Sequence, residues 1–541
     1  MTTTLRPARR SFSDRLADRL TQGRTGRQLT GLVTELQGRV LPLHWSNMFG
    51  VVSAACLVIL FLSGGVLMFF YSPSSDLVTY HGGYAALDGA TVSKAFGSTM
   101  AISFDLPGGL LLRQAHHWAA LLLPASIIVQ LLVTFFTGGF RTPRRASWVL
   151  LFLALIAALV AGWSGYALPD DLLSGTGLRI VQGIVLGIPL IGTWASALLF
   201  GGQFPGQIIQ NLYPIHLIAP IALVVLIALR IRLAYRNGPA QFAGEGRDEN
   251  TVIGVPVLPS AAARGAGVLF IVMGLILVIA SAFTVSPIWL YGPSSPGDAS
   301  AGSQPDWYTG FLDGALRLVP PGWEFVWLGR TWTLAILVPL VVVGVYLAAA
   351  LLYPFLEQWL TGDRREHNIL DRPRNAPTRT GIGVAGIVFY GVLWGAASSD
   401  LIATQFRLTL ESVIRFDQIA LVAGPVIALV IARRVCFALQ EKDREILLHG
   451  FETGRIVRLP GGEYTEIHQP VSEHEKWRLV NTSDYEPLQV RPDRRGHLGG
   501  VTRARAALSR LFFEDRIAPI PSTETLGEHD ALALSVPQRP E

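Results

Sequence analysis

Eight long apolar runs divide the chain, and polar, glycine-rich or proline-rich segments separate them. Each run is close to the ~20 residues that an α-helix needs to cross the hydrocarbon core of a membrane. The predicted membrane helices are 48–71, 110–136, 147–167, 208–235, 266–286, 332–355, 381–399 and 418–440. The pattern therefore predicts an all-α membrane protein with eight transmembrane helices.

The segments between these helices alternate in their arginine content. Arginines are abundant in the N-terminal segment and after the second, fourth and sixth helices, and they are few elsewhere between the helices. Because arginine and lysine are retained on the cytoplasmic side, we expect both termini to be cytoplasmic. The loops 72–109, 168–207 and 287–331 should then face the outside. Their high apolar content predicts packed caps rather than linkers.

Changes in composition divide the chain into four expected regions. These are a basic cytoplasmic segment (1–46), a first four-helix region (47–240), a second four-helix region (241–440) and a cytoplasmic tail (441–541). We expect the polar tail to be partly ordered near 441–475 and increasingly disordered beyond. The net charge of +5 belongs to the loop arginines and does not indicate nucleic acid as a partner. Two cysteines are too few for a Cys-ligated iron–sulfur cluster within this chain.

Three histidines, His116, His117 and His216, lie within the predicted spans. An ionisable residue inside a membrane helix is costly and indicates a functional site, although a hydrogen bond to a neighbouring helix explains a single histidine equally well. The second and fourth helices run in the same direction, and His116 and His216 lie at a similar depth near their outer ends. Two such histidines can hold a haem iron between them.

Fourteen residues after each of these histidines, on the same helix faces and about 21 Å along the axis, stand Gln130 and Arg230. Neither is a normal haem ligand, so the helices offer ligands for one haem and not for a second. Arg230 can also be interpreted as a helix-end arginine whose side chain extends to the interface.

Two further features surround the histidine pair. Arg113, one turn before His116, can pair with a haem propionate, although a lone arginine there is as often an interfacial anchor. Gly64 and Gly50 on the first helix are also fourteen residues apart and would let a flat macrocycle approach the backbone. Small residues also serve close packing between helices, so this spacing is weak evidence by itself.

Several longer stretches resemble a known family. They are GGLLLRQAHHWAALLLPAS (108–126), GYALPDDLLSGTG (165–177), SAGSQPDWYTGF (300–311), TGDRREHNILDRPRNAPTRT (361–380) and GRIVRLPGGEYTEIHQP (454–470). The chain resembles cytochrome b of the quinol–cytochrome c reductase (cytochrome bc) complexes, in the long form typical of actinobacteria. The likeness covers roughly residues 43–475.

The resemblance implies that the first four helices form a bundle that holds two b-type haems. His116 and His216 match the ligands of the outer haem, and Arg113 matches a partner of its propionate. Gly64 and Gly165 match glycines beside that haem.

In the family, a Pro-Glu-Trp-Tyr motif marks the outer quinol-oxidation site. Here the motif reads Pro305-Asp306-Trp307-Tyr308. Asp306 could accept a quinol proton, and Tyr308 could orient the quinol ring or the carboxylate.

The departures from the family concern the inner haem site. Gln130 and Arg230 replace its two histidines, Val133 replaces an arginine and Leu151 replaces a glycine. One residue is also missing between His216 and Pro220. We therefore expect one haem b, at the outer site, where the family norm is two.

The resemblance implies a membrane electron-transfer subunit of a menaquinol–cytochrome c reductase in the bacterial plasma membrane. It also implies a Rieske iron–sulfur subunit, a cytochrome c subunit, a terminal oxidase and a second copy of the chain as partners, besides membrane lipid. One alternative is a scaffold or assembly paralogue with little redox activity. A transporter is a weaker alternative, because broken helices or midplane charges are not evident in both halves.

Overall fold

The structure is a computed structural model that describes residues 24–295, 297, 306–320, 322–479, 487–489 and 499–513. Within these ranges, eight helices are long and apolar enough to cross a membrane. They are α3 (Met48–Leu67), α5 (Gly109–Phe136), α6 (Arg145–Ala167), α9 (Ile208–Asn237), α10 (Ala262–Ala282), α13 (Leu334–Thr361), α14 (Pro377–Ala396) and α16 (Leu410–His449). The predicted all-α membrane protein with eight spans is confirmed.

The helix ends differ from the predicted spans where polar residues continue a helix. The last span was expected over 418–440, but α16 has 40 residues, about 60 Å of helix. Polar residues extend the helix at both ends, and at its start Thr409 caps the first turn and accepts a hydrogen bond from the amide of Ser412. The first span ends at Leu67, four residues earlier than expected.

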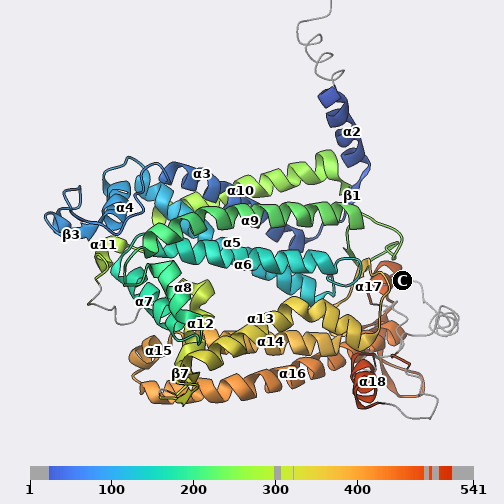
Figure 1. Ribbon diagram of the computed structural model, residues 1–541. Coiled ribbons are helices and arrows are strands. Elements are labelled where there is room, and N and C mark those ends of the chain that lie inside the picture. Colours follow the sequence, from blue (N-terminus) through green and yellow to red (C-terminus); the bar gives the residue numbers. More distant parts are fainter. Residues whose placement is uncertain are drawn as a thin grey trace, which may run out of the picture.

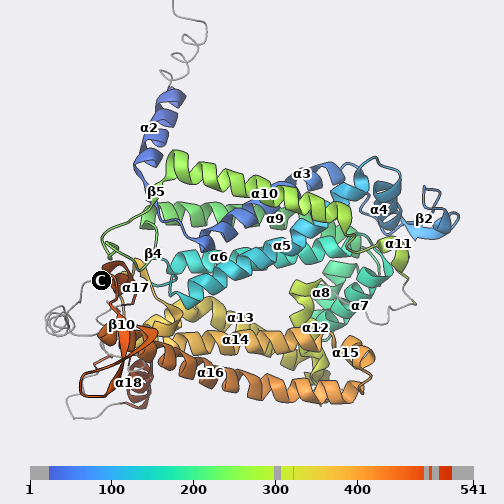
Figure 2. The ribbon, with the colours of Figure 1, turned by 180° about the vertical axis from the view of Figure 1, so that it is seen from behind.

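The spanning helices form two groups, which Figures 1 and 2 show from opposite sides. Helices α3, α5, α6, α9 and α10 make one group, and α13, α14 and α16 make the other. Thus α10, which the sequence places in the second region, packs against α3 and α5. The largest apolar cluster lies inside the first group and includes Cys56, Ile127, Leu151 and Leu223.

One end of the helices, which we name the cap end, is covered by short elements. They are β2 (Leu77–Thr79), η2 (Ala85–Leu87), β3 (Thr91–Ser93), α4 (Lys94–Phe104), α7 (Leu172–Leu186), α8 (Gly192–Phe200), α11 (Ile288–Tyr291), η4 (Trp307–Thr309), α12 (Gly310–Arg317), β6 (Glu324–Trp327), β7 (Arg330–Thr333) and α15 (Ser399–Phe406). Strands β2 and β3 pair antiparallel, as do β6 and β7. Buried side chains such as Phe96, Leu178 and Phe200 make the predicted packed cap.

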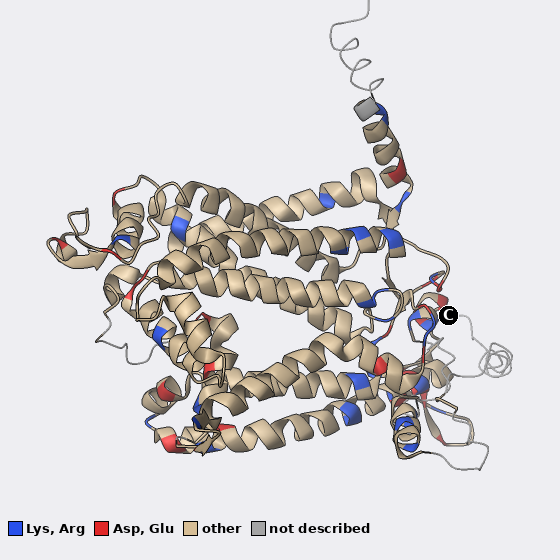
Figure 3. Ribbon diagram, in the orientation of Figure 1, with Lys and Arg blue, Asp and Glu red and all other residues tan. Residues whose placement is uncertain are grey.

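The opposite end, which we name the arginine-rich end, carries much of the lysine and arginine of the helices and the last described residues (Figure 3). Its small elements are α2 (Arg24–Gly38), β1 (Val40–Leu41), η1 (Trp45–Asn47), β4 (Gln241–Phe242), β5 (Val255–Pro256), η3 (Val257–Ala261), β8 (Ile369–Leu370) and η5 (Pro373–Asn375). Strand β1 pairs antiparallel with β5, and β4 pairs parallel with β8.

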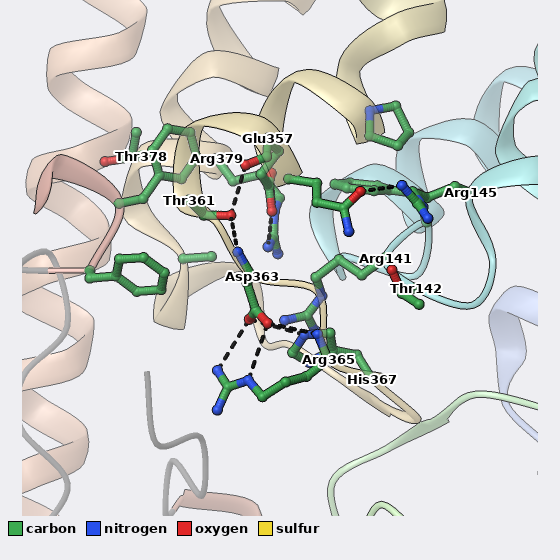
Figure 4. Close-up of a pocket in the computed structure, with 16 residues that line it drawn as sticks. Arg141, Thr142, Arg145, Glu357, Thr361, Asp363, Arg365, His367, Thr378 and Arg379 are labelled. Atoms are coloured by element: carbon green, nitrogen blue, oxygen red, sulfur yellow. Dashed lines mark hydrogen bonds and ion pairs between the residues drawn. The ribbon is translucent and has the colours of Figure 1, made fainter. Parts of the chain in front are cut away.

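An ion network joins the two helix groups at this end, and Figure 4 shows its contact between Arg379 and Glu357. The guanidinium of Arg379 on α14 donates to Glu357 on α13 at 2.6 Å and to Asp371 at 2.7 Å. Arg141, in the loop after α5, reaches the same Asp371 at 3.1 Å. Removing one partner of such a buried pair typically costs about 3–5 kcal/mol, so these contacts fix the relative position of α13, α14 and the loop.

The tail contains more order than the sequence predicts. It forms an antiparallel hairpin of β9 (Phe451–Arg458) and β10 (Tyr464–Gln469), then α17 (Glu473–Leu479) and α18 (Gly500–Phe513). Helix α18 lies where increasing disorder was expected. Its order has a tertiary cause: Arg505 donates to the carbonyl of Trp359 at 2.6 Å, and the buried Ser509 hydroxyl donates to that of Thr361. These bonds satisfy carbonyls that the end of α13 leaves open.

Candidate functional site

His116 on α5 and His216 on α9 face each other near the cap end. Their ring centroids are 6.2 Å apart and their planes are inclined by 61°. This gap can hold one metal ion bound to a nitrogen of each ring, since metal–imidazole bonds are about 2.0 Å long. The structure thus brings together the two histidines that the sequence singled out.

Hydrogen bonds to the far side of each ring fix its orientation. Nδ1 of His216 lies 2.9 Å from the carbonyl oxygen of Ala161, which can only accept. Nδ1 therefore carries the proton, and Nε2 keeps its lone pair. Nδ1 of His116 lies 2.9 Å from the hydroxyl of Ser63. Both rings are held as metal-ligating histidines usually are, by a polar group on the nitrogen that does not bind the metal.

A cavity of about 490 Å³ surrounds the histidine pair. Gly64 and Gly165 line it, and each is packed against one histidine. A Cβ added at Gly165 would lie 2.6 Å from Cε1 of His216, and one at Gly64 would lie 3.0 Å from Cε1 of His116. Neither position tolerates a side chain without moving a ring, so both glycines keep this cavity open.

Arg113 lies in the wall of the same cavity with only part of its guanidinium satisfied. Its side chain is buried, and one terminal nitrogen donates to the carbonyl of Ser286 at 2.7 Å. Its Nε is buried without a hydrogen-bond partner among the described residues. A buried, unpaired donor is costly, and a carboxylate in the cavity would satisfy it. The wall thus fits the propionate of a haem.

These features together fit a haem. Among the described residues, no group of three or more His, Cys, Asp or Glu side chains could hold a metal ion. A haem needs only two ligands from the protein, because the macrocycle supplies the other four. Two opposed histidines, two glycines and a partly unsatisfied arginine around one cavity provide what its iron, ring and propionate require.

The loop that carries Asp306 and Tyr308 reaches this cavity from the cap end. Asp306 lines the cavity, and its Oδ2 accepts a hydrogen bond of 2.8 Å from the hydroxyl of Tyr308. Tyr308 is almost completely buried, and a Cβ at Gly162 would collide with its hydroxyl. Burial, together with the adjacent carboxylate, raises the pKa of Tyr308 well above its usual value. Pro305 lies outside the described residues.

His117 is a residue of this site that the sequence reasoning did not assign. Its Nε2 lies 3.2 Å from Oδ1 of Asp306, so the carboxylate is held between His117 and Tyr308. The signal was present in the doubled histidine, because adjacent residues point about 100° apart on a helix. One of them can then face the haem and the other the loop. Ser63 and Ala161 carried no comparable signal.

The positions fourteen residues further along form a polar contact with each other. One terminal nitrogen of Arg230 donates to Oε1 of Gln130 at 3.1 Å. Nε2 of Gln130 donates to the hydroxyl of Ser53 at 2.9 Å. Ser53 in turn lies 2.6 Å from the hydroxyl of Ser126. This chain of bonds ties α3, α5 and α9 together, although Nε of Arg230 is buried and has no hydrogen-bond partner in the described part of the chain.

Apolar side chains make up the core of the same helix group. Leu151 is 3% exposed and belongs to the main core cluster with Ile127, Leu131 and Trp148. Val133, one turn after Gln130, offers no donor for a propionate. These residues do not fit a second haem: ligands, glycine and propionate partner are all absent from the matching positions.

Comparisons with known proteins bear on the family and the fold of this chain. Residues 121–293 match a family model described as cytochrome b (N-terminal)/b6/petB. That match includes His216, Gln130 and Arg230 and begins just after His116. A hyperthermophilic respiratory Complex III contains a chain of similar fold, with a TM-score of 0.58 and 19% identity over 77% of this chain and 98% of that one.

Curated relatives extend the match over nearly the whole length. The cytochrome bc1 complex cytochrome b subunit of Streptomyces coelicolor is 42% identical over 523 residues, 95% of each chain. That of Mycobacterium tuberculosis is 44% identical over 442 residues, 81% of this chain and 80% of the relative. The chain therefore belongs to the family of cytochrome b subunits of the cytochrome bc1 complex, and it is a haem-binding, electron-transferring membrane subunit of a respiratory oxidoreductase.

Proposed function

We propose that this subunit oxidises a quinol at the cap end, beside a single b haem held by His116 and His216. The observation that carries the proposal is the contrast between the two levels of the helices. An open cavity surrounds the histidine pair, whereas bonded and apolar side chains occupy the matching positions at Gln130 and Arg230. Menaquinol is the proposed substrate, by likeness to the actinobacterial relatives.

The chain's own groups supply the proton chemistry. Tyr308, whose pKa is raised, stays protonated and donates to Oδ2 of Asp306, which orients the carboxylate. Asp306 lines the cavity and is the acceptor for the proton of a quinol hydroxyl. His117 holds the other carboxylate oxygen from α5. The bound haem supplies a one-electron acceptor next to this base.

Arg113, Gly64 and Gly165 bind and orient the group rather than react. Arg113 places a fixed positive charge where a propionate would lie, and the glycines allow a flat ring to lie against α3 and α6. The surrounding wall is mainly apolar, for example at Leu60 and Leu123, and keeps water from the ring.

We propose the orientation from the charge asymmetry of the two ends. The arginine-rich end and both termini lie in the cytoplasm, and the cap end lies outside the bacterial plasma membrane. The four sequence regions then read as a cytoplasmic segment (1–46), a haem-binding region (47–240), a region with the quinol-site loop (241–440) and a cytoplasmic tail (441–541).

Membership of the family supports the partners. We propose a Rieske iron–sulfur subunit and a cytochrome c subunit as electron acceptors, a second copy of this chain and a terminal oxidase. With one haem, the chain lacks the second relay at Gln130 and Arg230, so we propose that it does not pass the second electron across the membrane.

Haem stoichiometry tests the proposal. We expect one b haem per purified chain by pyridine haemochrome assay, with an α-band that a quinol can reduce. Two b haems per chain would overturn the single-haem part. A variant with Gln130→His, Arg230→His and Leu151→Gly, which restores ligands and space, should take up a second haem.

The alternative is a scaffold or assembly role with little redox activity. The Gln130–Arg230 contact favours this scaffold role, because it stands where the active family holds the second haem of its electron path. A purified chain with no α-band after dithionite reduction would support the scaffold. A chain with one reducible haem and no quinol oxidation in the assembled complex would do the same.

A further inference from the structure

A groove that the redox site does not use lies at the arginine-rich end, between α6, α9 and α13. Its volume is about 790 Å³. Apolar side chains line its length, among them Val149, Leu229 and Leu233. Arg145, Arg232 and Arg236 also line it, and none of the described residues of its wall is acidic. We name it the arginine groove.

The three arginines approach the groove from two sides. Arg232 and Arg236 are exposed and four residues apart, so they share one face near the end of α9. Arg145 is the first residue of α6 and is held from α13, where Gln358 accepts its hydrogen bond and the Phe355 ring lies 5.5 Å from its guanidinium carbon. The positive end of the α6 dipole adds to the charge there.

Exposed arginines at helix ends are common in membrane proteins and bind no particular molecule by themselves. The arginine groove differs because cations stand on both walls, one of them is fixed by α13, and an apolar channel continues from them. An occupant must carry an anionic head and an apolar body. Soluble phosphate would leave the channel unfilled, and a neutral lipid would leave the arginines without a counter-charge.

We infer that the arginine groove binds one anionic phospholipid. Its phosphate lies among Arg145, Arg232 and Arg236, whose planar guanidinium groups suit phosphate oxygens. Its acyl chains follow Val149, Leu229 and Leu233 along the helices. The inference does not depend on the haem or on quinol oxidation, since no residue of the groove lines the histidine cavity.

The test is lipid binding by the full purified chain, counted by native mass spectrometry during titration with phosphatidylglycerol or phosphatidylcholine. We expect one phosphatidylglycerol to remain bound at concentrations where phosphatidylcholine does not. Arg232→Gln with Arg236→Gln should weaken that binding roughly 25-fold, about 5-fold for each arginine. Replacing both by lysine should retain most of the binding.

A matched control removes two arginines elsewhere at the same end. Arg264 on α10 and Arg434 on α16 are exposed and do not line the groove. Arg264→Gln with Arg434→Gln should leave the bound lipid in place. Equal losses in the two double variants would mean a diffuse charge effect and would overturn the inference.

Three more experiments test the acyl path and the other possible occupants, and a folding check accompanies them. Leu233→Trp fills the channel without changing charge and should also expel the lipid, while unchanged binding would contradict the predicted acyl path. Competition by soluble glycerophosphate at the same concentration as the lipid would show a phosphate site only. Cysteine cross-linking between copies through position 233 would show that a second chain occupies the groove. Unchanged helicity and elution volume establish that each variant is folded.

Discussion

Helices α5 and α9 carry different kinds of side-chain contact at two levels along their length. At the cap end His116 and His216 face a cavity, whereas fourteen residues later Gln130 and Arg230 bond to each other. The difference extends beyond the ligands. Gly165 leaves space against one histidine, and the matching Leu151 is buried in the core. A haem site thus depends on its ligands and on the absence of side chains around them.

Each level contains an arginine whose Nε has no hydrogen-bond partner among the described residues, but the two differ in the partner that could complete their bonding. Arg113 lines a cavity large enough for an anionic group, so a ligand can complete its bonding. Arg230 stands against Gln130, a neutral acceptor, which satisfies only part of its guanidinium. At the second level, Gln130 therefore satisfies only part of the hydrogen-bonding capacity of the Arg230 guanidinium.

The largest expected effect separates the two levels by haem content. His116→Leu or His216→Leu should greatly lower bound haem b, because each variant removes one of the two axial ligands of the iron. Gln130→Leu should leave the haem content at the wild-type value. The measurement is pyridine haemochrome per polypeptide. Loss of haem in the Gln130 variant would show that the second level also binds haem, against the proposal.

The next effect concerns the proton acceptor at the cap end. Asp306→Asn should lower quinol oxidation by about 10²–10⁴-fold, the usual contribution of a general base, with the haem spectrum unchanged. Asp88→Asn is a matched control, because Asp88 also bonds a histidine, His81, at 2.9 Å but lies exposed. Quinol-driven reduction of haem in the assembled complex is the measurement. An equal fall in both variants would remove the special role of Asp306.

A smaller effect tests the glycine cradle. Gly165→Val should displace the His216 ring, since the new Cβ would lie 2.6 Å from Cε1. Overpacking of this kind costs about 1–3 kcal/mol, so haem affinity should fall by roughly one to two orders of magnitude. Gly50→Ala is the counterpart at the other level, where the nearest atom is Oε1 of Gln130 at 3.8 Å. It should keep normal haem content. Haem retention during dilution distinguishes the two.

The smallest effect contrasts the two ends through pH. Burial is the main cause that raises the pKa of Asp170, at the cap end, from 3.8 to about 6. Because burial disfavours its charged form, the free energy of unfolding should fall as the pH rises from 4 to 6.5, by up to about 3 kcal/mol. At the arginine-rich end burial acts in the same direction on Asp363, but bonds from His367 and Arg365 hold its pKa below the usual range. Its contribution should be lost only as pH falls below about 4.

Thermal unfolding followed by circular dichroism measures both slopes. Asp170→Asn should flatten the change between pH 4 and 6.5, while Asp363→Asn should leave that interval unchanged and alter only the acid limb. If stability changes with pH equally in the Asp170 variant and the wild type between pH 4 and 6.5, Asp170 is not the cause of the change.

The sequence was informative where one helix carries the signal. Apolar runs predicted the spans, and the spacing of His116 and His216 predicted the facing pair, because both follow from helical periodicity. The departures at Gln130 and Leu151 were also visible. The bond between His117 and Asp306 was not, because 189 positions separate the two residues. Nor was α18, whose order depends on contacts with the end of α13 rather than on its own composition.

That contact has a consequence for biogenesis. Ser509 completes the end of α13 at Thr361, which leaves the ribosome 148 residues earlier. The membrane domain is therefore inserted with this helix end still open, and the final stretch of translation closes it. A chain that stops before residue 500 would carry all eight spans and still present an unfinished edge to the quality-control proteases of the cell.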